Sequence, residues 1–309
     1  MSIDLPPPEN IKLNWPLSRY PKSMKNQLPF RAFLVTTFLI ATSVVTFAQS
    51  PQLLKRTTTK TDKFDFSSGG TIAIVGAPTG SISVEGWNQN QIEISADIEL
   101  QAASEADLAK IAQVTSFVLQ ESLGRTGIIS TGTFDKKFLK SVDKKFPKQL
   151  IGLPFRIDYH IKVPHYSDLE IDGGDGDLSI AGVDGMMKIN YLKTNAKIDL
   201  VGGGINATFG SGSVEIVIPD RSWRGRLADV QLASGTMNVH LPPNLNAEID
   251  AVILRTGKVE NVFTDYKPRD RHEQFSDKSV IAKAGNGGIP LKFTVGDGTL
   301  KLSELDKPQ

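Results

Sequence analysis

The sequence of 309 residues contains no cysteine, only four histidines and almost no net charge, with 35 Lys and Arg against 34 Asp and Glu. Without cysteine the chain forms no disulfide, no thiolate zinc site and no catalytic thiol, and it carries no cysteine to accept a lipid. Near-zero net charge argues against a protein that binds duplex nucleic acid, since such proteins show a strong basic excess. The sequence therefore predicts no catalytic centre, metal site or cofactor.

Residues 31–50 have the composition of a secretory signal. A cationic start leads into the apolar run 32–47, and small residues follow it. The run is interrupted by threonine and serine and falls short of the roughly 20 residues of a membrane-spanning helix. We therefore expect residues 1–48 to be an N-terminal extension with a signal peptide, and an uncleaved anchor is the alternative. Because residues 1–23 are rich in proline and fit poorly before a signal, we expect translation to start at Met24.

The next part of the chain has the pattern of a flexible lead followed by β-strands. Residues 49–63 are polar and rich in threonine, and we expect them to be flexible. From Phe64 onward apolar and polar residues alternate, for example in residues 82–87 and 92–94, with Gly, Pro and Asn between the runs. Such alternation with period two is typical of half-buried strands. One helix interrupts them after Ser104, whose hydroxyl can cap the free N–H groups of the following turn.

Residues 134–148, with the sequence FDKKFLKSVDKKFPK, differ from the rest in carrying six lysines and two aspartates. Their apolar residues recur every four positions, which predicts one helical face that Pro147 ends: Phe134, Phe138, Val142 and Phe146. One interpretation is a basic amphipathic segment that contacts anionic lipid or lipopolysaccharide. The other interpretation is a plug, whose Phe face covers one end of a β core while the lysines face water.

A regular series of short strands with glycine between them follows. Its members have apolar residues two positions apart: 169–171, 178–180, 187–189, 198–200, 205–207, 214–216, 230–232, 237–239 and 249–251. Short strands at a regular spacing with glycine at the corners are typical of a solenoid or a barrel. We predict an all-β fold over residues 64–303, a β-solenoid of mostly parallel stacked short strands with about 18 residues per coil and one or two short helices. Residues 304–309 are a tail, and an antiparallel sandwich is the alternative fold.

Three segments are similar to the putative-adhesin β-strand-repeat family of bacterial envelopes: GSISVEGWNQNQIEISADIEL (80–100), IDYHIKVPHYSDLEIDGGDGDLSIAGVDGMMKI (157–189) and SGTMNVHLPP (234–243). This family, a domain of unknown function, shares a G-x-I-x-V-x-G-W opening, a VP before the repeats and recurring G-x-I/L-x-I/V units. The resemblance spans residues 64–303 and implies an extracytoplasmic, mostly parallel β-solenoid without established catalytic residues. Residues 134–148 and 269–273 depart from the regular pattern of the family.

Acidic turns are the features of the sequence that come nearest to a catalytic or metal site. Residues 173–178 resemble a calcium-binding β-roll turn, but the second aspartate is one position early and only one copy exists. A glycoside hydrolase on this scaffold would draw its two carboxylates from the same region, from Asp172, Asp175, Asp177 and Asp184. No aromatic platform accompanies these acids in the sequence, so we take them as solvated turn residues.

The candidate surface contacts are four lysines and two tryptophans: Lys136, Lys137, Lys144, Lys145, Trp87 and Trp223. The alternative for each tryptophan is that it covers an open side of the solenoid. Together these features predict an exported, non-enzymatic β-solenoid, in the periplasm or at the surface of a bacterium, that acts as a structural, adhesive or surface-binding module of the cell envelope. Its expected partners are envelope polysaccharide, anionic lipid or another envelope protein, and not nucleic acid. Two alternatives stay open: a carbohydrate-active enzyme on the same scaffold, and an envelope polymer made by end-to-end stacking.

Overall fold

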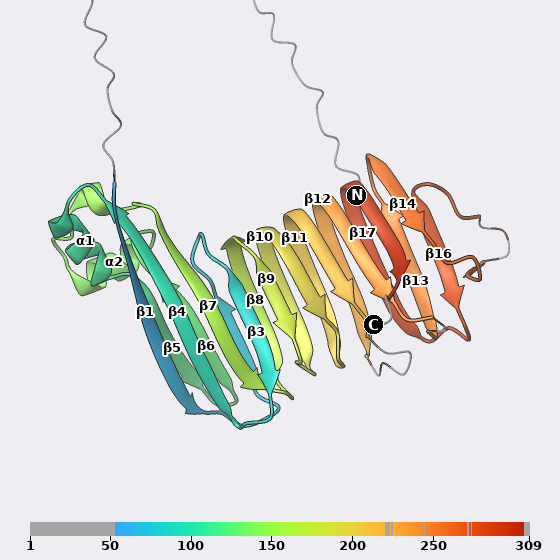
Figure 1. The fold of residues 1–309 in the computed structure, drawn as a ribbon, viewed down its shortest axis with the longest axis horizontal. Coiled ribbons are helices and arrows are strands. Elements are labelled where there is room, and N and C mark those ends of the chain that lie inside the picture. Colours follow the sequence, from blue (N-terminus) through green and yellow to red (C-terminus); the bar gives the residue numbers. More distant parts are fainter. Residues whose placement is uncertain are drawn as a thin grey trace, which may run out of the picture. The chain divides into compact units, whose positions relative to one another are not determined.

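The computed structural model describes residues 53–219, 223, 225–243, 245–270, 272 and 274–305, which belong to the unit Gln49–Gln309 (Figure 1). The expected signal segment 1–48, the start at Met24 and the last four residues of the tail lie outside the described residues. Within them the fold is all-β, as the alternating pattern predicts, and seventeen strands join in one hydrogen-bonded network. Two short α-helices and one 3-10 turn complete this part of the chain.

Parallel strands form the centre of the network: β8 (Asp168–Asp175), β9 (Leu178–Ala181), β10 (Met186–Asp199), β11 (Gly204–Val217), β12 (Leu227–Leu241) and β17 (Ile289–Glu304). From β8 to β11, paired residues are 18 positions apart, since Leu169 pairs with Met187 and Met187 pairs with Ile205. The predicted spacing of the short strands is therefore present in this part of the sheet.

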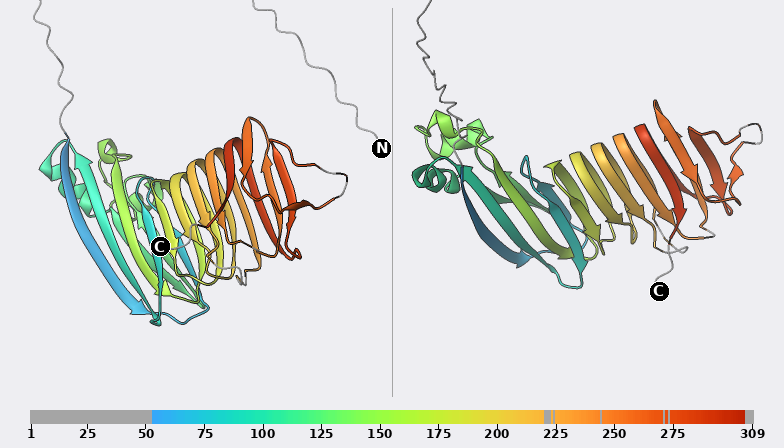
Figure 2. Two further views of the ribbon diagram at one scale, coloured as in Figure 1. Left: turned by 45° about the vertical axis from the view of Figure 1, so that its right-hand side comes forward. Right: turned by 45° about the horizontal axis from the view of Figure 1, so that its top comes forward.

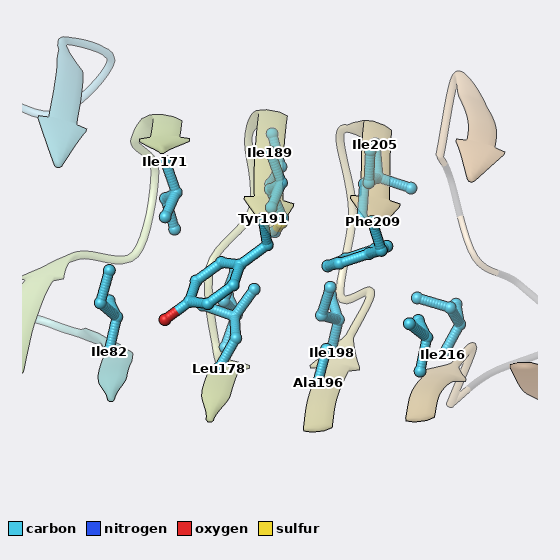
Figure 3. Packing of buried hydrophobic residues seen from close by; sticks show 14 of the residues in the cluster. Ile82, Ile171, Leu178, Ile189, Tyr191, Ala196, Ile198, Ile205, Phe209 and Ile216 are labelled. Atoms are coloured by element: carbon cyan, nitrogen blue, oxygen red, sulfur yellow. The ribbon is translucent and has the colours of Figure 1, made fainter. Parts of the chain in front are cut away.

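The long strands β10, β11 and β12 each bend once, so that two of the predicted short strands become the two halves of one strand. In β10, Ile189 and Tyr191 point inward before the bend, and Ala196 and Ile198 point inward after it. Leu192 lies at the bend and is exposed. The alternation of buried and exposed residues shifts by one position there, because two consecutive residues at the bend, Leu192 and Lys193, are both exposed. Figure 3 shows the side chains of both halves meeting in a shared interior.

Antiparallel strands flank the parallel centre at both ends. On the N-terminal side they are β1 (Leu54–Asp65), β4 (Gln91–Ala102), β5 (Ser116–Ser122), β6 (Arg125–Thr131) and β7 (Phe155–Pro164), with the antiparallel pairs β1–β4, β4–β7 and β5–β6. On the C-terminal side they are β13 (Ala247–Ile253), β15 (Lys267–Pro268) and β16 (Ser279–Ala284), with the pairs β13–β16 and β15–β16. The described strands thus form one large sheet that mixes parallel and antiparallel pairs and does not close on itself, so the all-β class is confirmed and the solenoid stays a prediction. A short turn returns the chain antiparallel, whereas a parallel neighbour needs a longer crossover.

Two segments lie out of sequence order in the stack (Figures 1 and 2). β2 (Thr71–Val75) lies between β6 and β8, and β3 (Ile82–Trp87) lies between β7 and β9, all in parallel pairs. β17 lies between β12 on one side and β13 with β14 (Gly257–Asn261) on the other. Near both ends of the stack, therefore, a segment remote in sequence completes the sheet by inserting between two others.

The helix predicted after Ser104 is present as α1 (Glu105–Ala112). The Ser104 hydroxyl accepts a hydrogen bond from the backbone N–H of Asp107 at 3.2 Å, which satisfies one of the free donors of the first turn. Leu108 and Ile111 are buried in the core, so the apolar face of the helix fixes it against the sheet.

The helix in the basic segment, α2 (Lys136–Val142), is shorter than predicted. Asp135 begins it, because its carboxylate accepts hydrogen bonds from two N–H groups of the first turn. Asp143 follows its last residue and bonds to a backbone N–H two positions on, which competes with further helix. The predicted apolar face is therefore wrong as a single face: Val142 is exposed, whereas Leu139, which is not a member of it, is buried.

Residues 54–63, predicted to belong to a flexible lead, form most of β1 instead. This strand pairs with β4 along its whole length, from Leu54 opposite Ala102 to Asp65 opposite Gln91. Most of its side chains are exposed, so no apolar alternation marks it in the sequence. Threonine, which is common in this stretch, is nevertheless among the residues that favour strands.

Candidate surface-binding site

The basic segment, residues 134–148, is inserted between the end of β6 and the start of β7. Within the described residues, no carboxylate lies at ion-pair distance from its six exposed lysines: Lys136, Lys137, Lys140, Lys144, Lys145 and Lys148. The carboxylates of Asp135 and Asp143 are directed to backbone N–H groups instead. The four predicted contact lysines are thus exposed, and the described residues give none of them an ion-pair partner.

Apolar side chains anchor this segment to the rest of the protein. Leu139 of α2 is 1% exposed, and Leu150, at the end of the 3-10 turn η1 (Lys148–Leu150), belongs to the core cluster. The ring of Phe134 stacks on the ring of Phe155 at the start of β7, with centroids 5.7 Å apart. The segment is therefore held in place on its apolar side while its ammonium groups face water.

An apolar hollow of about 460 Å³ lies beside the basic segment. Phe134 lines it, and so does Leu192 at the bend of β10; these side chains are 44% and 69% exposed. The corner residues 76–78 also line it, together with Asp172 and Asn190, which share a hydrogen bond of 2.9 Å. Sequence patterns did not reveal this hollow, because its lining comes together only through the pairing of strands that are far apart in the chain.

The two tryptophans lie in different environments. Trp87 is half-buried at the end of β3, where its Nε1–H donates to the carbonyl oxygen of Gln91 at 2.8 Å. The ammonium groups of Lys63 and Lys162 each lie 5.5 Å from the centroid of its ring. Trp223 is only 5% exposed and belongs to the core cluster, so the prediction of a surface contact there is wrong. It lies in the connection between β11 and β12, and its large ring adds apolar area to the core.

The acidic turn residues bond to the neighbouring strand. Each of three exposed aspartates receives a hydrogen bond from the residue 18 positions later: Asp172 from Asn190 at 2.9 Å, Asp175 from Lys193 at 3.3 Å and Asp177 from Asn195 at 3.1 Å. Asp184 is half-buried and lies against Gly202. Among the residues that the structure describes there is no cluster of three or more His, Asp or Glu suited to a metal ion.

Two groups of polar side chains on and beside β7 are paired by hydrogen bonds. The Tyr159 hydroxyl lies 2.7 Å from that of Ser130, and burial raises the pKa of Tyr159 to about 12. Burial also acts to raise the pKa of Asp158, but hydrogen bonds from Arg156 and Ser81 outweigh it and hold this pKa below its usual value. The Arg156 Nε–H donates to the carboxylate at 2.6 Å, and the Ser81 hydroxyl donates at 2.6 Å. These groups therefore stabilise this part of the fold as charged or hydrogen-bonded pairs.

Over the described ranges, no helix has both the length and the apolar character needed to cross a membrane.

No family model and no curated protein matches the chain. Similar solved structures include a putative cell adhesion protein from Clostridium sporogenes, with 14% identity, a TM-score of 0.43 and coverage of 80% of this chain and 100% of that one. A putative adhesin from Bacteroides fragilis has 12% identity and a TM-score of 0.34 over 79% and 97% of the two chains. A putative lipid binding protein from Parabacteroides distasonis has 12% identity and a TM-score of 0.29 over 79% and 96%.

Proposed function

We propose that this chain is an exported, non-enzymatic module of the cell envelope that binds an anionic lipid surface through the basic segment. In this proposal the central strands, β8 to β12 with β17, are successive coils of a β-solenoid that hold the segment in a fixed orientation. The observation that carries the proposal is the group of six exposed lysines, without a carboxylate partner in the described residues, beside the apolar hollow.

Charge supplies the larger part of the expected binding free energy. Six lysines and two aspartates leave an excess of four positive charges in the basic segment. A basic residue near an anionic membrane contributes about 1 kcal/mol, so the segment contributes about 4 kcal/mol, which alone corresponds to a Kd of about 1 mM. Because the attraction decays over a Debye length of about 8 Å at physiological ionic strength, binding should weaken as salt is added.

Exposed apolar side chains supply a second part. Phe134 and Leu192 line the same hollow and are 44% and 69% exposed. Burying the exposed part of each against acyl chains contributes about 1 kcal/mol. The sum of about 6 kcal/mol corresponds to a Kd on the order of 10–100 μM. A surface with both anionic headgroups and acyl chains satisfies both features, which favours lipid over a purely polar polyanion.

The N-terminal edge of the sheet favours a discrete module over a polymer made by end-to-end stacking. Lys60 on β1 reaches β5, where its ammonium group donates to the carbonyl oxygen of Phe117 at 2.9 Å and to the hydroxyl of Ser116 at 3.1 Å. The same ammonium group lies 4.2 Å from the centroid of the Phe117 ring. Lysine on an edge strand hinders the addition of a further strand, so this arrangement opposes stacking at that end.

Vesicle binding tests the proposal. The test variant reverses four lysines of the basic segment: Lys136→Glu, Lys137→Glu, Lys144→Glu and Lys145→Glu. The control variant makes the same change in net charge at exposed lysines elsewhere: Lys110→Glu, Lys188→Glu, Lys267→Glu and Lys283→Glu. Binding to phosphatidylcholine vesicles that contain phosphatidylglycerol is measured by co-sedimentation, with circular dichroism to verify folding.

We expect the wild type and the control variant to bind these vesicles and to ignore vesicles of phosphatidylcholine alone. The test variant should bind at least about 100-fold more weakly, since the segment then repels the anionic surface. Equal binding by the test variant and the wild type, or an equal loss in the control variant, would refute the role of the basic segment.

A further inference from the structure

A second hollow, which is polar, lies at the opposite end of β7 from the basic segment. β3 and β7 run parallel in register, with Trp87 opposite Pro164, so the turns that follow the two strands meet. The N–H of His165 donates to the carbonyl oxygen of Trp87 at 2.8 Å, which ties the two turns together. A hollow of about 220 Å³ opens between them. β7 has ten residues, so the basic segment and this hollow are roughly 30 Å apart.

The lining of this hollow consists of uncharged polar groups and rings. The turn between β3 and β4 contributes three exposed amide side chains, Asn88, Gln89 and Asn90. The turn after β7 contributes the rings of His165 and Tyr166. No carboxylate or ammonium group belongs to the residues that line the hollow. The ammonium groups of Lys63 and Lys162 lie beside one lining residue, Trp87, each 5.5 Å from the centroid of its ring. Amides both donate and accept hydrogen bonds, as the hydroxyl groups of a ligand would require.

Hydrogen bonds fix the orientation of two of these side chains in advance. The Ser68 hydroxyl donates to Oδ1 of Asn90 at 2.9 Å, which leaves the NH₂ group of Asn90 available as a donor. Nδ1 of His165 is hydrogen-bonded to the carbonyl oxygen of Gly182 and therefore carries the proton. In the neutral ring Nε2 is then an acceptor. The hollow thus presents donors and an acceptor that need no rearrangement to bind a ligand.

An exposed aromatic ring stands beside these groups. Tyr166 is 59% exposed, and its ring meets the ring of His165 edge to face, with centroids 4.8 Å apart. The ring of Trp87 also lines the hollow, but the ammonium groups of Lys63 and Lys162 already lie near that ring. A face of Tyr166 is therefore available for the apolar side of a ligand, while the amides reach its polar side.

We infer that this hollow binds a neutral saccharide. A pyranose ring has an apolar face of C–H groups, which packs on Tyr166, and a rim of hydroxyl groups. The hydroxyl groups accept from the amides of Asn88, Gln89 and Asn90 and donate to Nε2 of His165. This site goes beyond the proposed lipid contact and uses none of its residues. The protein would accordingly hold a neutral glycan at one end of β7 and an anionic surface at the other.

Titration by NMR tests this inference on the folded protein. Protein labelled with ¹⁵N is titrated with three neutral tetrasaccharides, cellotetraose, chitotetraose and maltotetraose, and with tetragalacturonate as a charged probe. The side-chain NH₂ signals of Asn88, Gln89 and Asn90 report on the site directly. We expect them to shift and saturate with at least one neutral tetrasaccharide, with a Kd of about 1 mM or tighter.

Two variants remove the recognition groups, and two serve as matched controls. Tyr166→Ala and Gln89→Ala should each weaken saccharide binding about tenfold. Leu254→Ala and Asn206→Ala change exposed side chains far from the hollow in sequence and should leave binding unchanged. The vesicle-test variant with four lysines reversed should also bind saccharide like the wild type, which separates this inference from the proposed function.

Three results would overturn the inference. The first is that no neutral tetrasaccharide moves the amide signals. The second is that only tetragalacturonate moves them, which would show an ionic site. The third is that the shifts persist unchanged in folded Tyr166→Ala and Gln89→Ala, which would place the ligand elsewhere.

Discussion

Replacement of Gly235 by alanine should destabilise the protein far more than an ordinary glycine substitution. Gly235 lies in β12 with φ of +134°, a conformation that L side chains rarely adopt. A Cβ atom there would lie 1.9 Å from the carbonyl oxygen of Gly212 in the neighbouring strand. A Cβ atom added to Gly298 of β17 would likewise lie 1.8 Å from the carbonyl oxygen of Gly235. The stacked strands therefore approach each other so closely at this corner that only glycine fits.

The expected cost combines two effects. Holding a residue with a side chain in such a backbone conformation costs on the order of 1–3 kcal/mol. Moving packed backbone to make room for an extra methyl group costs a further 1–3 kcal/mol. The sum, about 4 kcal/mol, is a large fraction of the 5–15 kcal/mol by which domains are usually stable. With a urea m-value of about 3 kcal/mol per M, the unfolding midpoint of Gly235→Ala should fall by about 1.3 M.

Urea unfolding followed by circular dichroism measures this cost, and Gly152→Ala is the matched control. Gly152 also has a positive φ, of +81°, but no atom lies within 4 Å of the position of its Cβ. Its replacement should therefore cost about 1 kcal/mol, from the backbone conformation alone. If Gly235→Ala and Gly152→Ala cost the same, the close approach of the strands contributes nothing and the reasoning is wrong.

Two further predictions concern charged groups of the fold. Because the pKa of Asp158 is lowered in the folded state, the stability that it contributes is present above the usual value of 3.8 and is lost as the pH falls from there through the lower pKa of the folded state. In urea unfolding at several pH values, the difference in unfolding free energy between the wild type and Asp158→Asn should therefore shrink from about pH 5 downward. A difference that stays constant would contradict this. Lys60→Val replaces the ammonium group that joins β1 to β5 with an apolar side chain that favours strands. Light scattering should therefore detect larger species for this variant than for the wild type. A variant that scatters like the wild type would show that Lys60 does not protect this edge.

The proposed lipid contact and the inferred saccharide site lie at opposite ends of β7, roughly 30 Å apart. A protein with both would engage two components of a cell envelope at once. Each contact is expected to be weak by itself, but once one is made, the other becomes intramolecular and the combined affinity exceeds either. The vesicle-test variant and Tyr166→Ala each remove one contact, so the two contributions are separable.

Local patterns were sufficient to predict several parts of the structure. Apolar and polar alternation identified most strands and their buried face, because the side-chain period of a strand is two. Ser104 identified α1, since a cap is a contact between residues three positions apart. The spacing of 18 residues between paired positions followed from the regular distance between short strands. The lysines of the basic segment, too, are exposed as predicted.

Other features depended on contacts between distant parts of the chain. The pattern of apolar residues shows which face of a strand is buried but not which strand lies beside it. It therefore did not reveal that β2, β3 and β17 each insert between other strands. β1 was missed because its stability comes from backbone hydrogen bonds to β4 and not from buried side chains.

The sequence by itself thus determined the class of fold, the 18-residue spacing of the repeat and the charge of the basic segment, because each depends only on composition and on residues close together in the chain. Only the tertiary structure decided that Trp223 is buried, and that Tyr166 and Asn88 face one hollow. The physical reason is that burial and the convergence of turns are set by strand register across the sheet. Register is a relation between residues that are far apart in the chain.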